Sequence, residues 1–259
     1  MKKDILRQFA VIFTTIYALV LNGMANAIPL NNRNTGQISD DFKVLFVPAG
    51  YVFAIWGVIY LFMLAYMVYQ ALPAHRQDER LRKTGWLFSI ANLLNGTWIV
   101  LWHFAVWNYS ASLIAMLGLL AMLVLIYLRL DIGRSPIQGA AKWCVAVTFS
   151  IYLGWITVAT IANLEDVLSL YWDGSPLSPL AWTLILLVAG VAIGGIMSFT
   201  RRDVAYALVL VWAFAGISVR WIQAPVLNVA GFAAAALVLA LLAASHLPAR
   251  RKTPVLTAR

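Results

Sequence analysis

One stretch decides the fold of this 259-residue chain: Pro48-Ala49-Gly50-Tyr51-Val52-Phe53-Ala54-Ile55-Trp56-Gly57-Val58-Ile59-Tyr60. It carries no charge, and the residues after it stay mostly apolar to Leu72. A helix over about 48–72 therefore exceeds the roughly 20 residues that span a bilayer. Pro48 suits the start of a helix, where its missing N–H costs little. Phe53, Trp56 and Tyr60 follow the i, i+3, i+7 spacing and share one face. The stretch predicts a membrane-spanning helix with an aromatic stripe.

The rest of the chain repeats this apolar character. Hydrophobic residues make up 63% of the sequence and charged residues 11%, whereas soluble domains average roughly 45–50% and 25%. A soluble fold of this size could not bury so much apolar surface. Candidate spans fall at about 8–27, 48–72, 86–107, 110–130, 141–164, 178–199, 204–221 and 225–246. Because none alternates as a strand does, the predicted fold is an all-α polytopic membrane protein with about eight transmembrane helices.

The basic residues lie in clusters between the apolar segments and predict the topology. With a cytoplasmic N-terminus, 16 of the 19 Lys and Arg residues fall inside: Lys2, Lys3, Arg7, Arg76, Arg80, Arg82, Lys83, Arg129, Arg134, Lys142, Arg201, Arg202, Arg250, Arg251, Lys252 and Arg259. The outside connections hold only Arg33, Lys43 and Arg220. The connection after the fifth segment has Glu165, Asp166 and Asp173 and no basic residue. This asymmetry predicts that both termini are cytoplasmic. It also explains the net charge of +9 without a nucleic acid partner.

The first segment has a second interpretation. Lys2 and Lys3, the apolar run 9–21 and the small residues at 25–27 together resemble a signal peptide with its cleavage site. Cleavage would leave seven helices and an outside N-terminus. Retention is favoured, because the apolar run continues beyond Leu21 and the later helices would otherwise lack their first partner.

The predicted membrane interior lacks ionisable side chains. Between the ends of the eight segments there is no Asp, Glu, Lys or Arg, and the only histidine is His103, near an end. This pattern argues against ion-coupled transport, pumping and acid–base catalysis. Three scattered histidines and the single Cys144 make no metal-ligand set. Cys144 is typical of a small buried residue. His103 is interpreted as an interfacial polar side chain, with haem ligation as the alternative.

Two more segments carry aromatic and amide side chains on one side. Segment 86–107 places Asn92, Asn95, Trp98 and Trp102 together, and segment 141–164 places Tyr152, Trp155, Ala159 and Asn163 in a narrow arc. Lipid cannot satisfy the amides, so they must face other helices or a cavity. Two interpretations stay open: interhelical packing, or an aromatic-walled pocket for a large flat apolar ligand.

The longest outside connection, about 29–47, also has two interpretations. It is rich in asparagine and other turn-forming residues, and roughly twenty residues is long for a compact polytopic protein. Long loops of this kind often act as lids over functional sites. A solvated linker explains the composition equally well.

At these motifs the chain resembles the translocator-protein family, also called tryptophan-rich sensory proteins or peripheral benzodiazepine receptor-like proteins. The first motif is Pro-x-x-aromatic-x-Phe-x-x-Trp-x-x-x-Tyr, the second is Asn-x-x-Trp, and the third is Tyr-x-x-Trp-x-x-x-Ala-x-x-x-Asn. They match here, in order and spacing, at Pro48, Tyr51, Phe53, Trp56, Tyr60, Asn95, Trp98, Tyr152, Trp155, Ala159 and Asn163. With the first helix, the resemblance covers roughly residues 1–165.

The chain departs from the family pattern in several places. Ala49 and Tyr51 stand where members commonly have Pro and Trp, and Ile151 replaces the Pro before the third motif. The sterol-recognition pattern often noted after the fifth helix is missing, although a similar run ends segment 110–130 at Arg129. Members usually end after five helices. The expected division is therefore a five-helix bundle over 1–165 and a three-helix membrane extension with a basic tail over 166–259. Within the extension, Gly190 and Gly194 suit close helix packing.

The resemblance implies a membrane sensor, receptor or regulator that binds a flat hydrophobic molecule, either a porphyrin or other tetrapyrrole or a sterol-like compound. Ten residues are expected to line its site: Tyr51, Phe53, Trp56, Tyr60, Asn95, Trp98, Tyr152, Trp155, Ala159 and Asn163. Tyr51, Trp56, Trp98 and Trp155 would stack on the ligand, Ala159 would leave room for it, and 29–47 would be its lid. Asn163 would alternatively tie helices together. Two rival functions are a transporter or facilitator of an uncharged solute, and light- or oxygen-dependent porphyrin breakdown.

Location and partners follow from the same resemblance. We expect a multi-pass protein of a bacterial inner membrane, with no catalytic residue, no metal and no obligatory cofactor. A bound porphyrin or haem intermediate is the expected ligand. The resemblance also implies a homodimer formed through helix faces, unless the extension covers that surface.

Overall fold

The computed structural model describes residues 2–28, 30–171 and 177–247. Helices dominate these residues, and no strand occurs in them. The elements are α1 (Lys2–Ala27), η1 (Leu30–Asn32), α2 (Thr35–Ser39), η2 (Gly50–Ala54), α3 (Ile55–Ala71), η3 (Pro73–His75), α4 (Glu79–His103), α5 (Ser110–Arg129), α6 (Gly139–Ala141), a π-helical turn η4 (Lys142–Val147), α7 (Thr148–Tyr171), α8 (Pro179–Arg201), α9 (Val204–Arg220) and α10 (Pro225–His246). The all-α prediction is confirmed.

Each of the eight predicted spans coincides with a long helix. Six spans in the described residues are long and apolar enough to cross a bilayer: α1, η2 with α3, α5, α6 through α7, α8 and α10. The apolar helix α9 has 17 residues, which is about 25 Å and the lower limit for a span. Helix α4 has sufficient length, 25 residues, but charged residues open it and amides interrupt it. The chain is a polytopic membrane protein.

Several helix ends differ from the approximate limits predicted for the spans. Helix α4 begins at Glu79 rather than 86, because the Asp78 side chain caps it, and it ends at His103 rather than 107, before residues with positive φ. Helix α7 continues to Tyr171 rather than 164. Glu165 and Asp166 therefore lie in a helix and not in a connection, and Asp166 is buried there. The expectation of a span interior free of titratable groups thus fails at the last turns of α7.

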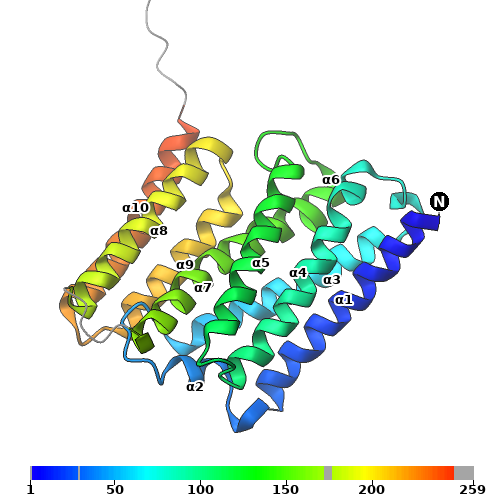
Figure 1. Cartoon of the computed structure of the whole chain (residues 1–259). Helices are drawn as coiled ribbons and strands as arrows, with labels where there is room; N and C mark the ends of the chain where they lie inside the picture. The colour runs from blue at the N-terminus through cyan, green and yellow to red at the C-terminus, as the bar shows by residue number, and fades with distance from the viewer. Residues whose placement is uncertain (1, 29, 172–176, 248–259) are drawn as a thin grey trace, which may run out of the picture.

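The helices are arranged as one continuous bundle (Figure 1). Helix α4 packs against α1 and α5, α3 lies against α1 and α7, and α7 joins α5 to α9. Helices α8 and α10 pack on α9 at the edge away from α1. The N-terminus and the end of α10 lie at the same end, and α2 lies at the opposite end (Figure 1). Following the predicted topology, these are named the inner end and the outer end.

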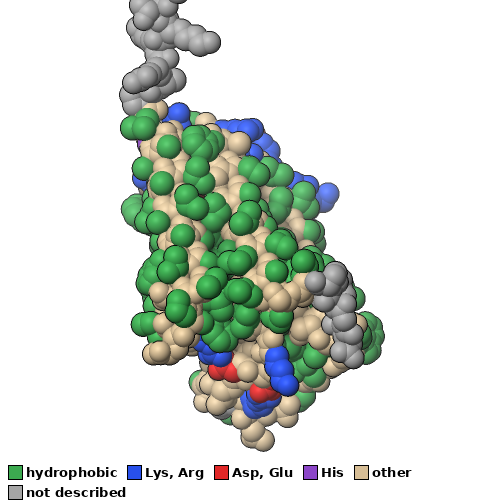
Figure 2. All heavy atoms as spheres, turned by 90° about the vertical axis from the view of Figure 1, so that its left-hand side faces the viewer, with side chains coloured by type: hydrophobic (Ala, Val, Ile, Leu, Met, Phe, Trp, Pro, Cys, Tyr) green, Lys and Arg blue, Asp and Glu red, His purple; other side chains and the backbone are tan. Residues whose placement is uncertain are grey.

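Charged side chains lie at both ends of one face of the molecule. On the face formed by α8 and α10, a broad band of hydrophobic side chains separates basic side chains at the inner end from mixed acidic and basic side chains at the outer end (Figure 2). An apolar band between two charged rims is the surface that a bilayer needs. The basic residues 250–252 and 259, and Asp173, lie outside the described residues.

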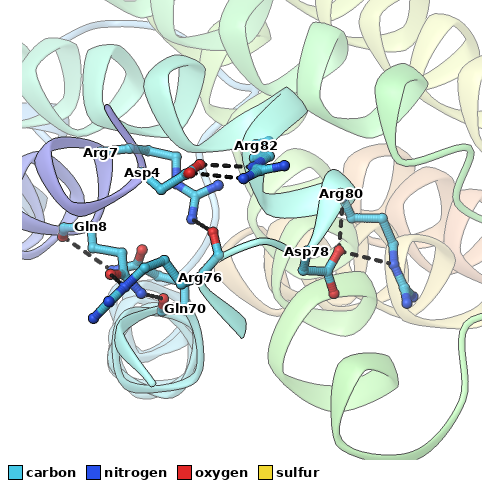
Figure 3. Close-up of polar contacts among 8 residues, drawn as sticks. All are labelled: Asp4, Arg7, Gln8, Gln70, Arg76, Asp78, Arg80 and Arg82. Atoms are coloured by element: carbon cyan, nitrogen blue, oxygen red, sulfur yellow. Dashed lines mark hydrogen bonds and ion pairs between the residues drawn. The ribbon is translucent and has the colours of Figure 1, made fainter. Parts of the chain in front are cut away.

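Helix α1 is joined to the bundle by polar contacts at its inner end (Figure 3). The Arg82 guanidinium donates two hydrogen bonds, of 2.7 and 2.8 Å, to the Asp4 carboxylate. The Gln8 amide donates to the Gln70 carbonyl at 2.7 Å. Arg7 lies buried beside them and donates to a backbone carbonyl. Cleavage of the first segment would remove every one of these contacts, and its retention stays a prediction.

The last three helices are attached to the bundle through a buried carboxylate. Asp203 lies between α8 and α9 and accepts from the Tyr127 hydroxyl of α5 at 2.7 Å and from the Ser150 hydroxyl of α7 at 2.5 Å. It also caps α9 by accepting from the Tyr206 N–H at 3.1 Å. Next to it, Arg201 forms an ion pair with the Asp131 carboxylate of the connection after α5 at 2.9 Å.

Glycines bring the extension helices close together. A Cβ on Gly190 would lie 2.5 Å from the Phe214 ring of α9, and one on Gly194 would lie 3.1 Å from Val238 of α10. The sequence-based prediction that this pair serves close packing is confirmed.

We predict that Asp203→Ala destabilises the protein strongly, because it leaves the buried Tyr127 and Ser150 hydroxyls without their acceptor. The expected loss is about 1–3 kcal/mol of unfolding free energy for each unsatisfied group. Thermal unfolding of the purified protein in detergent would measure it. Glu79→Ala is the control, because this carboxylate is exposed and its pairing with Lys83 contributes little. Equal melting temperatures for the two variants would contradict the prediction.

Candidate functional site

The three predicted aromatic stripes meet around Trp56. Its ring stacks on Tyr60 of α3 with centroids 5.4 Å apart and on Trp98 of α4 at 6.2 Å. Tyr152 and Trp155 of α7 approach it edge-on at 6.3 and 6.1 Å. One helix turn separates the stripe residues on each helix, so every ring faces the same interior point. These five side chains, with Phe53 and Trp102, are named the aromatic cluster.

The stack continues from the interior to the outer end. Trp98 stacks on Trp102 of the same helix at 6.2 Å, and Trp102 stacks on Phe42 of the outer connection at 5.4 Å. The successive rings from Tyr60 to Phe42 are inclined by only 21–29° to one another. A ladder of nearly parallel rings thus leads from the middle of the bundle to its outer surface.

Tyr51 and Phe53 are placed differently by the turn before α3. The chain forms the 3₁₀ helix η2 from Gly50 and enters α3 only at Ile55, two and seven residues after the expected start at Pro48. Phe53 contacts the cluster through Trp155, with centroids 6.0 Å apart. Tyr51 points away from the cluster, is half exposed, and meets Trp212 of α9 edge-on at 5.4 Å.

The predicted amides lie at helix contacts beside the cluster. Asn95 is fully buried and its Oδ1 accepts from the Asn22 amide of α1 at 2.6 Å. Asn163 is buried in α7 and donates to the Ser112 hydroxyl of α5 at 3.5 Å. Both amides therefore form hydrogen bonds between helices. This agrees with the interpretation of the amides as interhelical packing contacts. Ala159 is half-buried, one turn beyond Trp155.

Several buried polar atoms of this region have no hydrogen-bond partner in the described part of the chain. They are Tyr60 Oη, Asn95 Nδ2, Trp98 Nε1, Trp102 Nε1, Tyr152 Oη, Trp155 Nε1 and Asn163 Oδ1. Buried polar groups are normally paired, and each unpaired one costs free energy. A concentration of them on three facing helices is characteristic of a site that pairs with something besides the protein.

A cavity at the outer end shares Phe53 with the cluster. Its volume is about 460 Å³, and its lining comprises Asn26, Asn34, Gly36, Gln37, Asp40, Gly50, Phe53 and Ala54. Phe53 and Ala54 are its apolar side chains, and four of the other side chains are polar. Its volume lies within the range of small-molecule sites.

The connection over this cavity is folded rather than a solvated linker. Asn34 and the Gln37 three residues later form a capping box at the start of α2. Asn31 donates to the His103 carbonyl at 3.1 Å, and Arg33 forms an ion pair with Asp41. Residues 30–47 are named the lid, after the role that the sequence analysis predicted for this connection.

The ion pair of the lid persists through the physiological pH range. The Arg33 guanidinium, hydrogen-bonded to the Asp41 carboxylate, lowers the pKa of that carboxyl below its usual 3.8. A lowered pKa means that the pair contributes above about pH 4 and is lost only as the pH falls through the shifted value. Both side chains are largely exposed, so the pair positions the lid more than it stabilises the fold.

A second cavity, of about 670 Å³, adjoins the lid on its other side. Its lining includes Phe42, Val44, Leu164, Glu165 and Trp182, and it is mostly apolar. Glu165 accepts from the Phe46 N–H at 3.2 Å and so joins α7 to the lid. The lid thus borders both cavities. The first cavity reaches the aromatic cluster at Phe53, and the second reaches it at Phe42, whose ring stacks on Trp102.

Sequence reasoning missed the polar side of the first cavity. Asn34, Gln37 and Asp40 lie in the connection that was predicted to be a lid, and Asn26 lies in the first predicted span, but none of them was predicted to line the site. The asparagine-rich composition of the lid was the one available signal. His103 is buried, and its Nδ1 lies 2.8 Å from the Ile99 carbonyl. In the described residues, no three His, Cys, Asp or Glu side chains gather in an arrangement that could hold a metal ion.

Comparison with known proteins gives one match. A family model described as TSPO-like protein matches residues 8–244. The matched range runs through α8 and α9 and into α10, well beyond the residues 1–165 that carry the sequence motifs. Neither the curated proteins nor the solved structures contain a significant match to the chain.

We predict that Tyr152→Phe leaves the stability of the ligand-free protein unchanged or raises it slightly. The substitution removes a buried hydroxyl that has no partner in the described residues. Tyr127→Phe is the matched control. It is expected to lower the unfolding free energy by about 1–3 kcal/mol, because the Asp203 carboxylate loses a donor. Melting temperatures in detergent compare the two, and an equal loss in both variants would contradict the prediction.

Proposed function

The chain belongs to the TSPO-like protein family, and on that premise we propose that it is a membrane ligand-binding sensor or regulator for a flat hydrophobic molecule. A porphyrin or other tetrapyrrole, or a sterol-like compound, is the ligand class. The observation that carries the proposal is the set of unpartnered polar atoms on the buried rings of the aromatic cluster, beside which Phe53 forms part of the lining of the first cavity. The protein binds this ligand without transforming it.

The mixed lining of the cavity supports a ligand with one apolar face and polar substituents. Phe53 offers an aromatic ring to a bound ligand. One stacked or edge-on contact between two rings contributes roughly 0.5–1.5 kcal/mol. Asn26, Asn34 and Gln37 offer amide donors and acceptors in the same lining. A flat macrocycle with polar groups on its edge satisfies both kinds of side chain, and an entirely apolar molecule leaves the amides unpaired.

The unpartnered donors of Trp155 and Trp98 support a deeper contact. Indole N–H groups only donate, so a ligand atom that pairs with them must accept a hydrogen bond. Carboxylate and carbonyl oxygens are such acceptors. The buried surroundings strengthen any such bond, because little water competes for it.

We predict that protoporphyrin quenches the tryptophan fluorescence of the purified protein saturably and that Phe53→Ala raises its dissociation constant roughly 2–12-fold. This range corresponds to the loss of one ring contact of about 0.5–1.5 kcal/mol. Phe13→Ala is the matched control, since Phe13 is 70% exposed on the lipid-facing side of α1, and its variant is expected to bind as the wild type does. Absence of saturable quenching would overturn the proposed function.

Flux and turnover measurements separate the proposal from its rivals. A sensor binds protoporphyrin without carrying it across proteoliposomes, whereas a facilitator releases it on the other side. An enzyme forms product in the dark, whereas photochemistry of a bound pigment requires light. We further propose a bacterial inner-membrane location with both termini in the cytoplasm, because the basic clusters at 76–83, 129–142 and 201–202 share the inner end with the N-terminus.

A further inference from the structure

The outer end of α9 is joined to the lid by two side chains. The Arg220 guanidinium contacts the Asp40 carboxylate at 2.7 Å, and Asp40 also lines the first cavity. Trp221, the residue after α9, donates its indole N–H to the Leu45 carbonyl at 2.8 Å. The lid is therefore attached to a helix that follows it by some 170 residues in the chain.

One to two turns further in, α9 is joined to the start of the aromatic motif. The Trp212 indole donates to the Val52 carbonyl of η2 at 3.0 Å, and its ring meets Tyr51 edge-on. The Gly216 carbonyl accepts from the Ala49 N–H at 3.0 Å. The two segments that frame the first cavity, the lid and η2, thus share one support.

This support requires a close approach at Gly216. A Cβ at this position would overlap the Val52 side chain and would lie 3.3 Å from the Pro48 Cβ. Valine has no flexible end that could move aside, so only glycine lets α9 approach η2 this closely. The motif proline, which the sequence analysis assigned to a helix start, instead packs against α9.

The contacts differ in strength. Both side chains of the Arg220–Asp40 pair are partly exposed. Exposed ion pairs contribute little to the free energy of unfolding. The Trp221 indole supplies a donor to the backbone carbonyl of the non-helical residue Leu45. The Val52 carbonyl, which accepts from Trp212, also accepts from the Ile55 N–H. Helix α9 is itself held at its inner end by Asp203. The outer contacts are therefore made by a fixed helix.

We propose that α9 completes the ligand site: Trp212, Gly216, Arg220 and Trp221 hold η2 and the lid in the closed arrangement and thereby set how fast the ligand enters and leaves. The identity of the ligand in this inference rests on the proposed function. The anchoring of the lid and η2 by α9 rests on the contacts described above. Helix α9 is on this account part of the binding site, with Trp212 and Trp221 as positioning residues.

Hydrogen–deuterium exchange of the ligand-free protein tests the anchoring independently of any ligand. In a double Arg220→Gln, Trp221→Phe variant, amides of 36–46 are expected to exchange at least tenfold faster than in the wild type. Amides of 91–99 in α4 are expected to be unchanged, because they lie in a helix that α9 does not support. A Trp212→Phe variant, which keeps a ring against Tyr51 and loses the indole donor, is expected to speed exchange at 49–54.

Arg202→Gln with Trp143→Phe is the matched control, because both residues are exposed at the inner end. Lid exchange in the anchoring variant equal to that in the control would overturn the inference. Faster exchange in the lid and in α4 alike would also overturn it, since the contacts would then support the whole fold and not the lid.

Stopped-flow binding of protoporphyrin connects the anchoring to the site. The anchoring variant is expected to show association and dissociation rates each raised at least threefold, with a smaller change in their ratio. Faster lid exchange together with unchanged rates would overturn the proposed control of ligand access. If the wild type binds no protoporphyrin, the proposed function fails, and faster lid exchange would still support the anchoring.

Discussion

The carboxylate of Asp203 is the contact on which the architecture depends. It lies at the inner end, where the chain turns from α8 into α9, and it accepts hydrogen bonds from helices α5, α7 and α9 at once. A bilayer supplies no water to a buried carboxylate, so three donors must come from the protein. Their geometry fixes the position of α9 against the bundle. The contacts of Arg220 and Trp221 with the lid depend on this position, because both residues lie at the far end of the same helix, about 25 Å away.

Most of the fold could be predicted from the sequence, because the bilayer imposes a strict length and polarity on every span. Eight apolar segments gave eight helices, and the charge clusters fell at their ends. The errors occurred where local capping overrode hydrophobicity. Asp78 starts α4 early, and Glu165 and Asp166 remain helical because the protein surrounds them at the outer end of α7. The length of an apolar segment reveals neither a capping side chain nor the burial of a carboxylate by neighbouring helices.

The site was predictable only in part, for a different physical reason. The i, i+3, i+7 spacing specifies a helix face, and so it brought Trp56, Trp98 and Trp155 together. It says nothing of the 3₁₀ helix that turns Tyr51 outward. It also cannot reveal contacts in which an indole meets a backbone carbonyl, since any residue can supply a carbonyl. The contact between Trp221 and the lid is of this kind, and only the folded chain shows it.

The position of α9 has a consequence for how the protein behaves when it is dilute in the membrane. A lid supported by a second subunit would open as the concentration of subunits fell, because the support would dissociate. Here the supporting helix, α9, belongs to the same chain as the lid. Its effective concentration at the lid is therefore set by the chain and does not change with the expression level of the protein. The face of α7 at Gly154 is already covered by Val209 and Tyr206 of α9. Any pairing of two copies must therefore use a surface other than this part of α7.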